Sequence, residues 1–345
     1  APQIDVPVRL NTNENPFGPS RALVKDLERA LSEVGGNLNR YPDRDAIELR
    51  RELARYINQL SDTTFDERSL WAANGSNEII QTIFLAFGGF GRHALGFEPS
   101  YSMHRNISRA TGTQWIAVER NDDYSIDLGS AAEVINAQSP TLIFLTTPNN
   151  PTGTVTSLTD IERIAQICRE RNSLLVIDEA YQEFSSEQSA VSLIDKYPNI
   201  IVSRTMSKAF AFAGARVGYL VAHPSVIDAM RLVRLPYHLS SLTQVAASAA
   251  LEFSDELLAT VQGLIAARED VAGELTQLGL EVVPSCSNFL LFSGFKRASA
   301  DVWKDLLDKG VLIRDVGLEG YLRVTIGNGA ENKKFLMALK EVLNK

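Results

Sequence analysis

Leu174-Leu-Val-Ile-Asp178 and Ile200-Ile-Val-Ser-Arg-Thr-Met-Ser-Lys208 are the two stretches of this sequence that decide its fold. Each begins with a short apolar run, which is typical of a fully buried strand, and each ends in residues that carry charge or donate hydrogen bonds. Similar apolar runs occur at Leu142 to Leu145 and Val217 to Val221, and an amphipathic helix is predicted from Leu158 to Arg171. Strands that alternate with helices predict an α/β fold, with a mostly parallel central sheet and helices on both faces.

The two ends of the chain follow other patterns. Residues 1–40 are expected to form an N-terminal arm and a first helix, which the apolar spacing places over Ser20 to Val34. The alternating pattern assigns residues 41–236 to a large domain. Beyond it, a long predicted helix from Asp255 to Leu278 is followed by short strands, so residues 237–345 are expected to form a smaller α+β C-terminal subdomain. No internal repeat or low-complexity linker separates the two units, so we expect them to pack closely around a cleft.

Composition restricts the possible functions. The 345 residues are 45% hydrophobic and 22% charged, which is ordinary for a globular protein. The net charge of -8, with no block of like charges, argues against nucleic acid or an anionic membrane as partner, and no apolar run is long enough to span a bilayer. Cys168 and Cys286 cannot form a disulfide framework, and the four histidines lack metal-binding spacing. We therefore expect a cytoplasmic protein that binds a small molecule and no metal.

The segment that ends the second decisive stretch has the chemistry of a phosphate site. Thr205, Ser207 and Arg216 supply hydroxyl and guanidinium donors, and neighbouring glycines leave space for an anion. Lys208 lies among these donors. A lysine beside other cationic groups can lose its proton near neutral pH and form a Schiff base with an aldehyde, which is the chemistry of pyridoxal phosphate enzymes. Taken alone, the Ser-x-Lys pattern is more typical of a surface loop with an ordinary solvated lysine.

Other polar residues are expected at the same edge of the sheet. Asp178 follows an apolar strand, and ligands of open α/β sheets bind at the carboxyl ends of the strands. A carboxylate there can keep a pyridinium nitrogen protonated, while Tyr181 and Asn150 can reach the phenolate oxygen of such a ring. Gly75-Ser-Asn77 opens a predicted helix, whose backbone N–H groups can bind phosphate.

Four motifs occur in one order along the chain: Gly75-Ser76-Asn77, Asn150-Pro-Thr-Gly153, Asp178-x-Ala-Tyr181, and Ser207-Lys208 followed by Arg216. This set resembles the fold type I, class II aminotransferases. Within them, nearly the whole chain is similar to the histidinol-phosphate aminotransferases. The supporting stretches are Leu10-Asn-Thr-Asn13-Glu-Asn-Pro16, Asn39-Arg-Tyr41-Pro42-Asp43, Pro99-Ser-Tyr101-Ser-Met-His104 and Arg234-Leu-Pro-Tyr237-His238.

The resemblance implies a homodimeric enzyme of histidine biosynthesis that uses pyridoxal 5'-phosphate. It would exchange an amino group between L-histidinol phosphate and 2-oxoglutarate, giving imidazole acetol phosphate and L-glutamate. Position in the family motifs implies catalytic roles for Lys208 as the Schiff-base lysine, Asp178 as the pyridine partner, and Tyr181. The other residues implied to bind the cofactor are Gly75, Ser76, Asn77, Tyr101, Asn150, Thr205, Ser207, Arg216 and, from the partner subunit, Tyr41. The residues implied to bind substrate are Asn13, Tyr237, Arg314 and Arg323.

Two other activities are compatible with the same motifs. An aromatic aminotransferase would use Tyr101 and Tyr237 to hold an aromatic ring, and a decarboxylase of a phosphorylated amino acid shares all four motifs. Arg314 and Arg323 lie on predicted strands of the second subdomain that face the expected cleft. Their position favours a substrate with anionic groups, and relative activity on the three kinds of substrate separates the alternatives.

Overall fold

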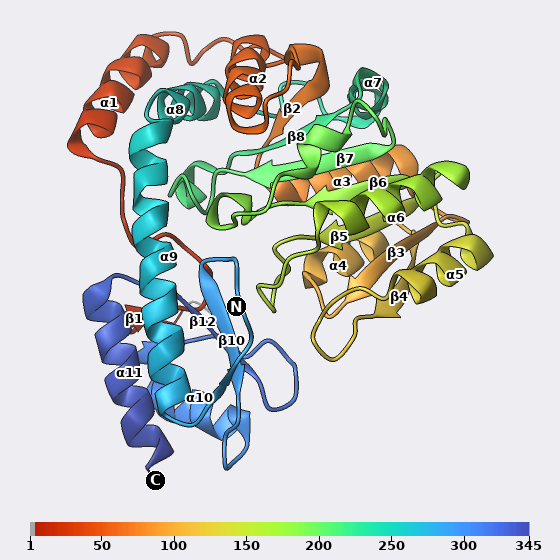
Figure 1. Ribbon diagram of the computed structural model, residues 1–345. Helices are drawn as coiled ribbons and strands as arrows, with labels where there is room; N and C mark the ends of the chain where they lie inside the picture. Colours follow the sequence, from red (N-terminus) through yellow and green to blue (C-terminus); the bar gives the residue numbers. More distant parts are fainter. Residues whose placement is uncertain (1–3, 345) are drawn as a thin grey trace.

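The apolar runs of the sequence form the centre of a seven-stranded sheet in the computed structural model, which describes residues 4–344 (Figure 1). The strands are β2 (Leu70–Ala73), β3 (His93–Glu98), β4 (Gln114–Glu119), β5 (Leu142–Thr146), β6 (Leu174–Asp178), β7 (Ile200–Thr205) and β8 (Gly218–Ala222). Their order is β2-β8-β7-β6-β5-β3-β4, and only β8 runs antiparallel to its neighbours within this sheet. The predicted α/β fold with a mostly parallel sheet is therefore confirmed.

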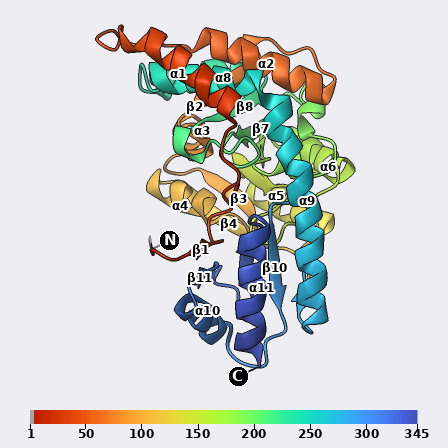
Figure 2. The same cartoon turned by 90° about the vertical axis from the view of Figure 1, so that its left-hand side faces the viewer.

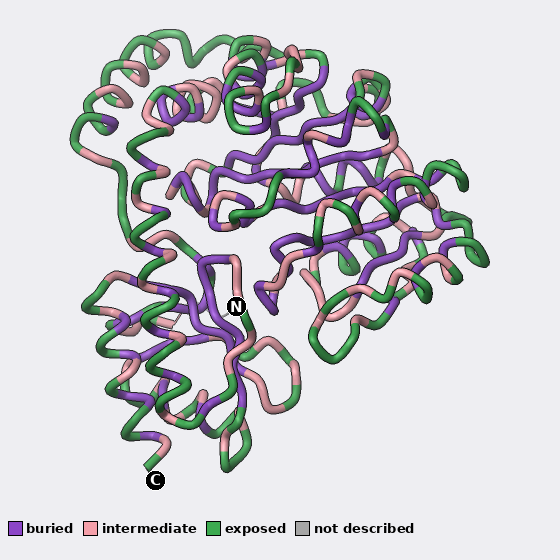
Figure 3. Tube along the Cα trace, viewed as in Figure 1, coloured by how far each residue is buried: buried purple, intermediate pink, exposed green. Residues whose placement is uncertain are grey.

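Helices cover both faces of this sheet because successive side chains of each strand point in opposite directions. Leu142 and Phe144 of β5 pack with α3 (Ser76–Phe87), α4 (Ser102–Ala110) and α7 (Pro224–Val233). Ile143 and Leu145 pack on the other face, which α5 (Leu128–Gln138) and α6 (Leu158–Glu170) cover. The central strands are buried along their whole length, as Figure 3 shows.

A smaller unit lies below the large sheet in Figure 1. Its antiparallel sheet has the order β12-β10-β9, and it includes α10 (Ser299–Asp308) and α11 (Gly329–Leu343). The three strands are β9 (Glu281–Val282), β10 (Phe289–Ser293) and β12 (Leu322–Thr325). Figures 1 and 2 show α9 (Ser254–Gln277) running from the large unit down beside α11. The N-terminal arm joins this unit, because β1 (Val8–Arg9) pairs in parallel with β11 (Val311–Leu312).

The first helix, α1 (Arg21–Gly35), begins where the sequence predicted, with the Ser20 hydroxyl accepting a hydrogen bond from the amide of Leu23 at 3.2 Å. It packs on α8 (Ser241–Glu252), as does α2 (Ile47–Ser61). Sequence analysis did not identify α8 as a separate helix. The predicted boundary between the large and the C-terminal domain lies at residue 236, which would place α8 in the C-terminal domain. In the structure α8 instead lies beside α1 and α2. The three domain ranges therefore stay a prediction.

A buried ion cluster joins the ends of β6 and β7. The Arg204 guanidinium donates from Nε to Glu179 Oε2 at 2.9 Å and from Nη1 to Glu183 Oε1 at 3.0 Å. The Glu179 carboxylate also accepts hydrogen bonds from the Ser189 hydroxyl and the Ala190 amide, both at 2.7 Å. Burial raises the pKa of Glu183, and the Arg204 charge opposes that rise. Each charge therefore depends on the others for compensation in the interior.

We predict that Arg204→Met destabilises the protein strongly, because it leaves two carboxylates in the interior without a counter-charge. The free energy of unfolding should fall by about 3–5 kcal/mol, measured by urea denaturation. Lys196→Met is the control, since it removes an exposed ion pair with Glu162 and should leave the urea midpoint unchanged. Equal midpoints for the Arg204 variant and the unmodified protein would contradict a stabilising role for the cluster.

Candidate active site

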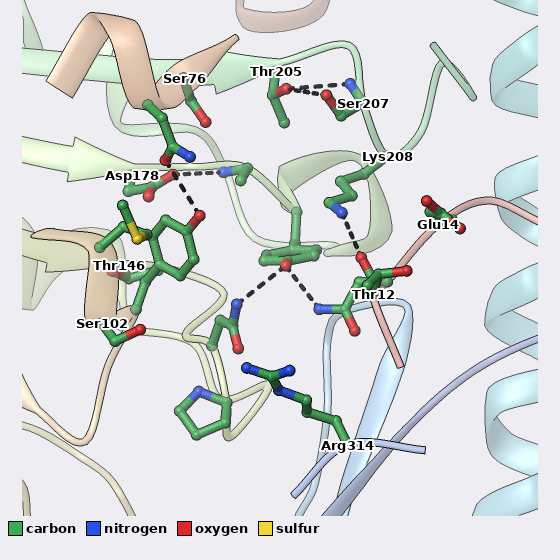
Figure 4. A pocket seen from close by; sticks show the side chains of 18 of the residues that line it. Thr12, Glu14, Ser76, Ser102, Thr146, Asp178, Thr205, Ser207, Lys208 and Arg314 are labelled. Carbon is green, nitrogen blue, oxygen red and sulfur yellow. Dashed lines mark hydrogen bonds between the residues drawn. The ribbon is translucent and has the colours of Figure 1, made fainter. Parts of the chain in front are cut away.

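A cavity of about 560 Å³ lies at the carboxyl ends of β5, β6 and β7 (Figure 4). The large unit contributes these strand ends and the N-terminus of α3. The arm contributes Asn11 to Glu14, and the smaller unit contributes Arg314 and Arg323. Segments from three parts of the chain therefore meet at one site, in the cleft that the sequence predicted.

Asp178 lies at the floor of this cavity, at the end of β6, and its carboxylate is held by two donors. His104 Nε2 lies 3.0 Å from Asp178 Oδ2, and the Ala180 amide donates to Oδ1 at 3.2 Å. The Tyr101 ring meets the His104 ring edge-on, with centroids 5.4 Å apart, and its hydroxyl donates to Asn77 Oδ1 at 3.2 Å. Burial raises the pKa of Tyr101. This chain of contacts fixes the direction in which the Asp178 carboxylate points.

Lys208 follows β7 and reaches the cavity from the opposite side to Asp178, as Figure 4 shows. Its Nζ donates to the carbonyl oxygen of Thr12 in the arm at 2.9 Å. Burial and, to a smaller extent, the charges of Arg323 and Arg216 together lower the pKa of Lys208 to about 8, against an opposing effect of Glu14. About half of these amines are therefore neutral at pH 8, as a nucleophile or a general base requires.

Tyr181 is the centre of a second network. Its hydroxyl oxygen accepts hydrogen bonds from Asn13 Nδ2 at 2.8 Å and Asn150 Nδ2 at 3.3 Å. Asn150 in turn accepts from Arg323 Nη1 at 2.5 Å, and Asn13 accepts from the Thr325 hydroxyl at 3.0 Å. Burial raises the pKa of Tyr181 to about 12 and lowers that of Arg323 to about 10. Tyr181 is thus neutral, and its hydroxyl proton can be donated to an acceptor in the cavity.

The residues around Lys208 that were predicted to bind phosphate lie where β7 and β8 meet the N-terminus of α3. Gly75 caps α3 with φ +86°, and a Cβ atom at this position would lie 2.5 Å from Arg216 Nη2. Only glycine therefore allows the guanidinium to lie against the helix terminus. Arg216 Nη1 donates to the Ser207 hydroxyl at 3.4 Å, which is 3.0 Å from the Thr205 hydroxyl. A helix N-terminus, two hydroxyls and a guanidinium fit a phosphate dianion.

Most of the residues expected at the site are brought together here. Those that line the cavity are Asn13, Ser76, Asn77, Tyr101, Asn150, Asp178, Tyr181, Thr205, Ser207, Lys208, Arg216, Arg314 and Arg323. Tyr41 and Tyr237 are not among its lining residues, and their rings stack on each other with centroids 4.4 Å apart. Tyr41 is 80% exposed.

His104, Thr12 and Glu14 are among the residues of this site to which the sequence assigned no role. For His104, the spacing of three residues from Tyr101 was the available signal, since it places both side chains on one face of a helix. Thr12 and Glu14 lie in a stretch that supported the resemblance, but no role was assigned to either.

Within residues 4–344, no group of three or more histidine, cysteine, aspartate or glutamate side chains is arranged to hold a metal ion. No helix in the same range is long and apolar enough to cross a membrane.

Known proteins share both the sequence and the fold. Residues 5–339 match the model of the aminotransferase class I and II family. A curated histidinol-phosphate aminotransferase of Mycobacterium sp. (strain JLS) is 56% identical over 339 residues, which are 98% of this chain and 89% of that protein.

Two solved structures extend the likeness to the fold. The histidinol-phosphate aminotransferase of Sinorhizobium meliloti, in complex with pyridoxal-5'-phosphate, superposes with a TM-score of 0.86 at 26% identity, covering 98% of this chain and 91% of that one. The L-threonine-O-3-phosphate decarboxylase of Porphyromonas gingivalis gives a TM-score of 0.82 at 26% identity, covering 98% and 100%. Motifs, fold and relatives agree, and the chain belongs to the class I and II aminotransferase family.

Proposed function

We propose that this chain is a histidinol-phosphate aminotransferase that uses pyridoxal 5'-phosphate to transfer an amino group between L-histidinol phosphate and 2-oxoglutarate in histidine biosynthesis. The observation that carries the proposal is one cavity containing the carboxylate of Asp178, the amine of Lys208 and the guanidinium groups of Arg314 and Arg323. Relatives that are 54–56% identical over nearly the whole chain carry this activity in their names. A high proportion of shared residues supports the same substrate for this chain.

Several residues of the cavity suit the parts of this cofactor. Asp178, oriented by His104, would hold a proton at the ring nitrogen, and Tyr101 would pack against the ring. Tyr181 and Asn150 would contact the ring hydroxyl. The groups suited to the phosphate are Gly75, Ser76, Asn77, Thr205, Ser207 and Arg216. When bound, the cofactor supplies a conjugated ring that accepts the electron pair released at the substrate carbon.

Proton transfer is the task of Lys208. Its lowered pKa of about 8 keeps a fraction of the amine neutral at physiological pH, so Nζ can take the proton from the substrate carbon and return one later. Arg323 and Arg314 would bind the carboxylate of glutamate in one half-reaction and the phosphate of histidinol phosphate in the other, since guanidinium forks pair with both anions. Asn13 would complete this substrate site from the arm.

We also propose that the enzyme is a cytoplasmic homodimer whose active sites are shared between subunits. Leu232 and Leu235 are 86% and 77% exposed, and they lie shortly before Tyr237, whose ring stacks on that of Tyr41. Exposed apolar side chains of this size favour a partner surface. In the dimer, Tyr41 would reach the partner's cofactor phosphate, and Tyr237 would approach a substrate.

The substrate proposal predicts strong selection for the phosphate group. Buried cationic donors stay unpaired when the anion is missing, so kcat/KM for histidinol phosphate should exceed that for histidinol and for phenylalanine by roughly 10². The purified protein is assayed with 2-oxoglutarate and each amino donor. Equal turnover of phenylalanine would instead indicate an aromatic aminotransferase, and carbon dioxide release from a phosphorylated amino acid would indicate a decarboxylase.

We predict that Asp178→Asn binds the cofactor but transaminates poorly, because an amide cannot hold the ring-nitrogen proton by charge. Loss of an ion pair that shifts this nitrogen by two to three pKa units costs about 3–4 kcal/mol, or a fall in kcat of roughly 10² to 10³. This fall in rate is measured by single-turnover experiments with glutamate as amino donor. Asp195→Asn, at an exposed site, is the matched control and should keep full activity. An unchanged rate in the Asp178 variant would remove this residue from the mechanism.

Subunit mixing tests the shared site. Tyr41→Phe and Lys208→Ala subunits should each be impaired as homodimers, whereas a mixed dimer would contain one site with both residues unmodified. Random 1:1 mixing should therefore restore activity to about a quarter of the unmodified level. If the mixture is no more active than its parents, or if the active protein sediments as a monomer, the shared site is wrong.

A further inference from the structure

Glu14 presents an unpaired carboxylate to a cavity whose charged lining residues are mainly cations. Asp178 is the other carboxylate of the cavity, and it is engaged by His104 and the Ala180 amide. Within residues 4–344, the Glu14 side chain makes no hydrogen bond or ion pair. It is exposed to the cavity beside Lys208, as Figure 4 shows. The mechanism described above gives this charge no task.

The backbone on both sides of Glu14 is fixed. The Asn13 amide donates to the Thr325 hydroxyl at 3.0 Å, which attaches the arm to β12. On the other side, Asn15 Nδ2 donates to the carbonyl of Ala209 at 3.3 Å, directly after Lys208. Glu14 is therefore held between the two units while its own side chain stays free. A side chain on fixed backbone that has no partner in the protein is well placed to bind a ligand.

The charges of the proposed substrate complement this cavity, and the inference rests on the proposed function. Histidinol phosphate has three polar parts: a phosphate, an ammonium group and an imidazole. Arg314 and Arg323 match the phosphate, and the ammonium nitrogen must lie at the reacting centre near Lys208. Only the imidazole ring is left without a partner in the cavity. This ring carries N–H donors and has an unperturbed pKa near 6.5.

We infer that Glu14 is a specificity-determining residue that accepts a hydrogen bond from the imidazole ring of the substrate. An ionised carboxylate is an acceptor only, so it favours a ring with N–H groups over a phenyl ring. It gives no such help to glutamate, whose side chain ends in a carboxylate and would be repelled. Glu14 thus accounts for selection of the ring, as the arginines account for selection of the phosphate.

A role through Lys208 is the competing explanation, since Glu14 also opposes the lowering of the Lys208 pKa. The two roles differ in which reactions they affect. A change at Lys208 alters both half-reactions by a similar factor, because the same amine moves the proton in each. A contact with imidazole alters only the half-reaction with histidinol phosphate.

The test compares two amino donors that differ only in the ring, histidinol phosphate and phenylalaninol phosphate. Single-turnover kcat/KM values are measured on the holoenzyme for both donors and for glutamate. In Glu14→Gln, preference for the imidazole donor should fall about tenfold, because a charge-assisted hydrogen bond becomes a neutral one. The rate with glutamate should stay the same or rise. Glu14→Asp should recover part of the preference, and Glu133→Gln, on α5, should change nothing.

The pH dependence gives a second measurement. Preference for histidinol phosphate should rise as the pH falls from about 7.5 to about 6, since the ring becomes imidazolium. This rise should be absent in Glu14→Gln. The other charged groups of the cavity act on the phosphate and ammonium groups of both donors alike: Lys208, Arg216, Arg314, Arg323 and Asp178.

Two outcomes would overturn the inference. If Glu14→Gln keeps its preference for histidinol phosphate over phenylalaninol phosphate, Glu14 does not bind the imidazole ring. If the variant instead loses the same factor in rate with all donors, Glu14 acts through Lys208. Failure of the proposed function is distinguishable from both, because the unmodified enzyme would then be inactive with histidinol phosphate. Thermal midpoints equal to that of the unmodified protein exclude a folding defect in the variants.

Discussion

Pairing of β6 with β7 is the constraint on which the site depends. In-register parallel pairing places Asp178 opposite Ser203, so the carboxylate and the segment from Thr205 to Lys208 emerge from one edge of the sheet. The ladder continues past the strands, where the Glu179 amide donates to the Ser203 carbonyl at 2.9 Å. On the opposite face, the Arg204 cluster ties the same two strand ends together. A slip of one residue would turn Asp178 and Thr205 away from the cavity.

The large unit supplies only part of the site, and the arm and the smaller unit complete it. Asn13 donates to Tyr181 and also contacts Thr325, while Arg323 reaches Asn150 across the cleft. Arg323 and Thr325 alternate on β12, so one strand presents both contacts. A ligand that displaces the Arg323 guanidinium would therefore also change the hydrogen bonds around Tyr181. The residue proposed to bind substrate, Arg323, is thus connected by hydrogen bonds to the residues proposed to contact the cofactor, Asn150 and Tyr181.

The sequence predicts the features that depend on the order of apolar and polar residues within one segment. Buried strands and their carboxyl-end residues follow from apolar runs and side-chain chemistry, and Asp178, Asn150 and Lys208 do meet at one edge. It does not predict contacts that depend on packing between distant segments. His104 reaches Asp178 only because α4 lies below β6, and α8 packs on α1 across most of the chain length. For His104 the sequence offers only its spacing of three residues from Tyr101, and the packing of α8 on α1 leaves no periodic signal.

The placement of Tyr41 and Tyr237 has a different cause. Both residues follow from the resemblance alone, and in one chain they meet only each other, at an exposed surface. In the proposed dimer, Tyr41 would contact the partner's cofactor phosphate, which agrees with its position outside the cavity of its own chain.

Electrostatics explains why one cavity can serve both chemistry and binding. Arg216 and Arg323 attract anionic groups, and the same charges add to burial in lowering the pKa of Lys208. When an anion neutralises either guanidinium, that contribution weakens, so the Lys208 amine becomes a stronger base as the ligand binds. In the proposed mechanism, proton abstraction by Lys208 would then be easier with substrate bound than without it. The cations proposed to bind the substrate would therefore also adjust the pKa of the amine proposed to react with it.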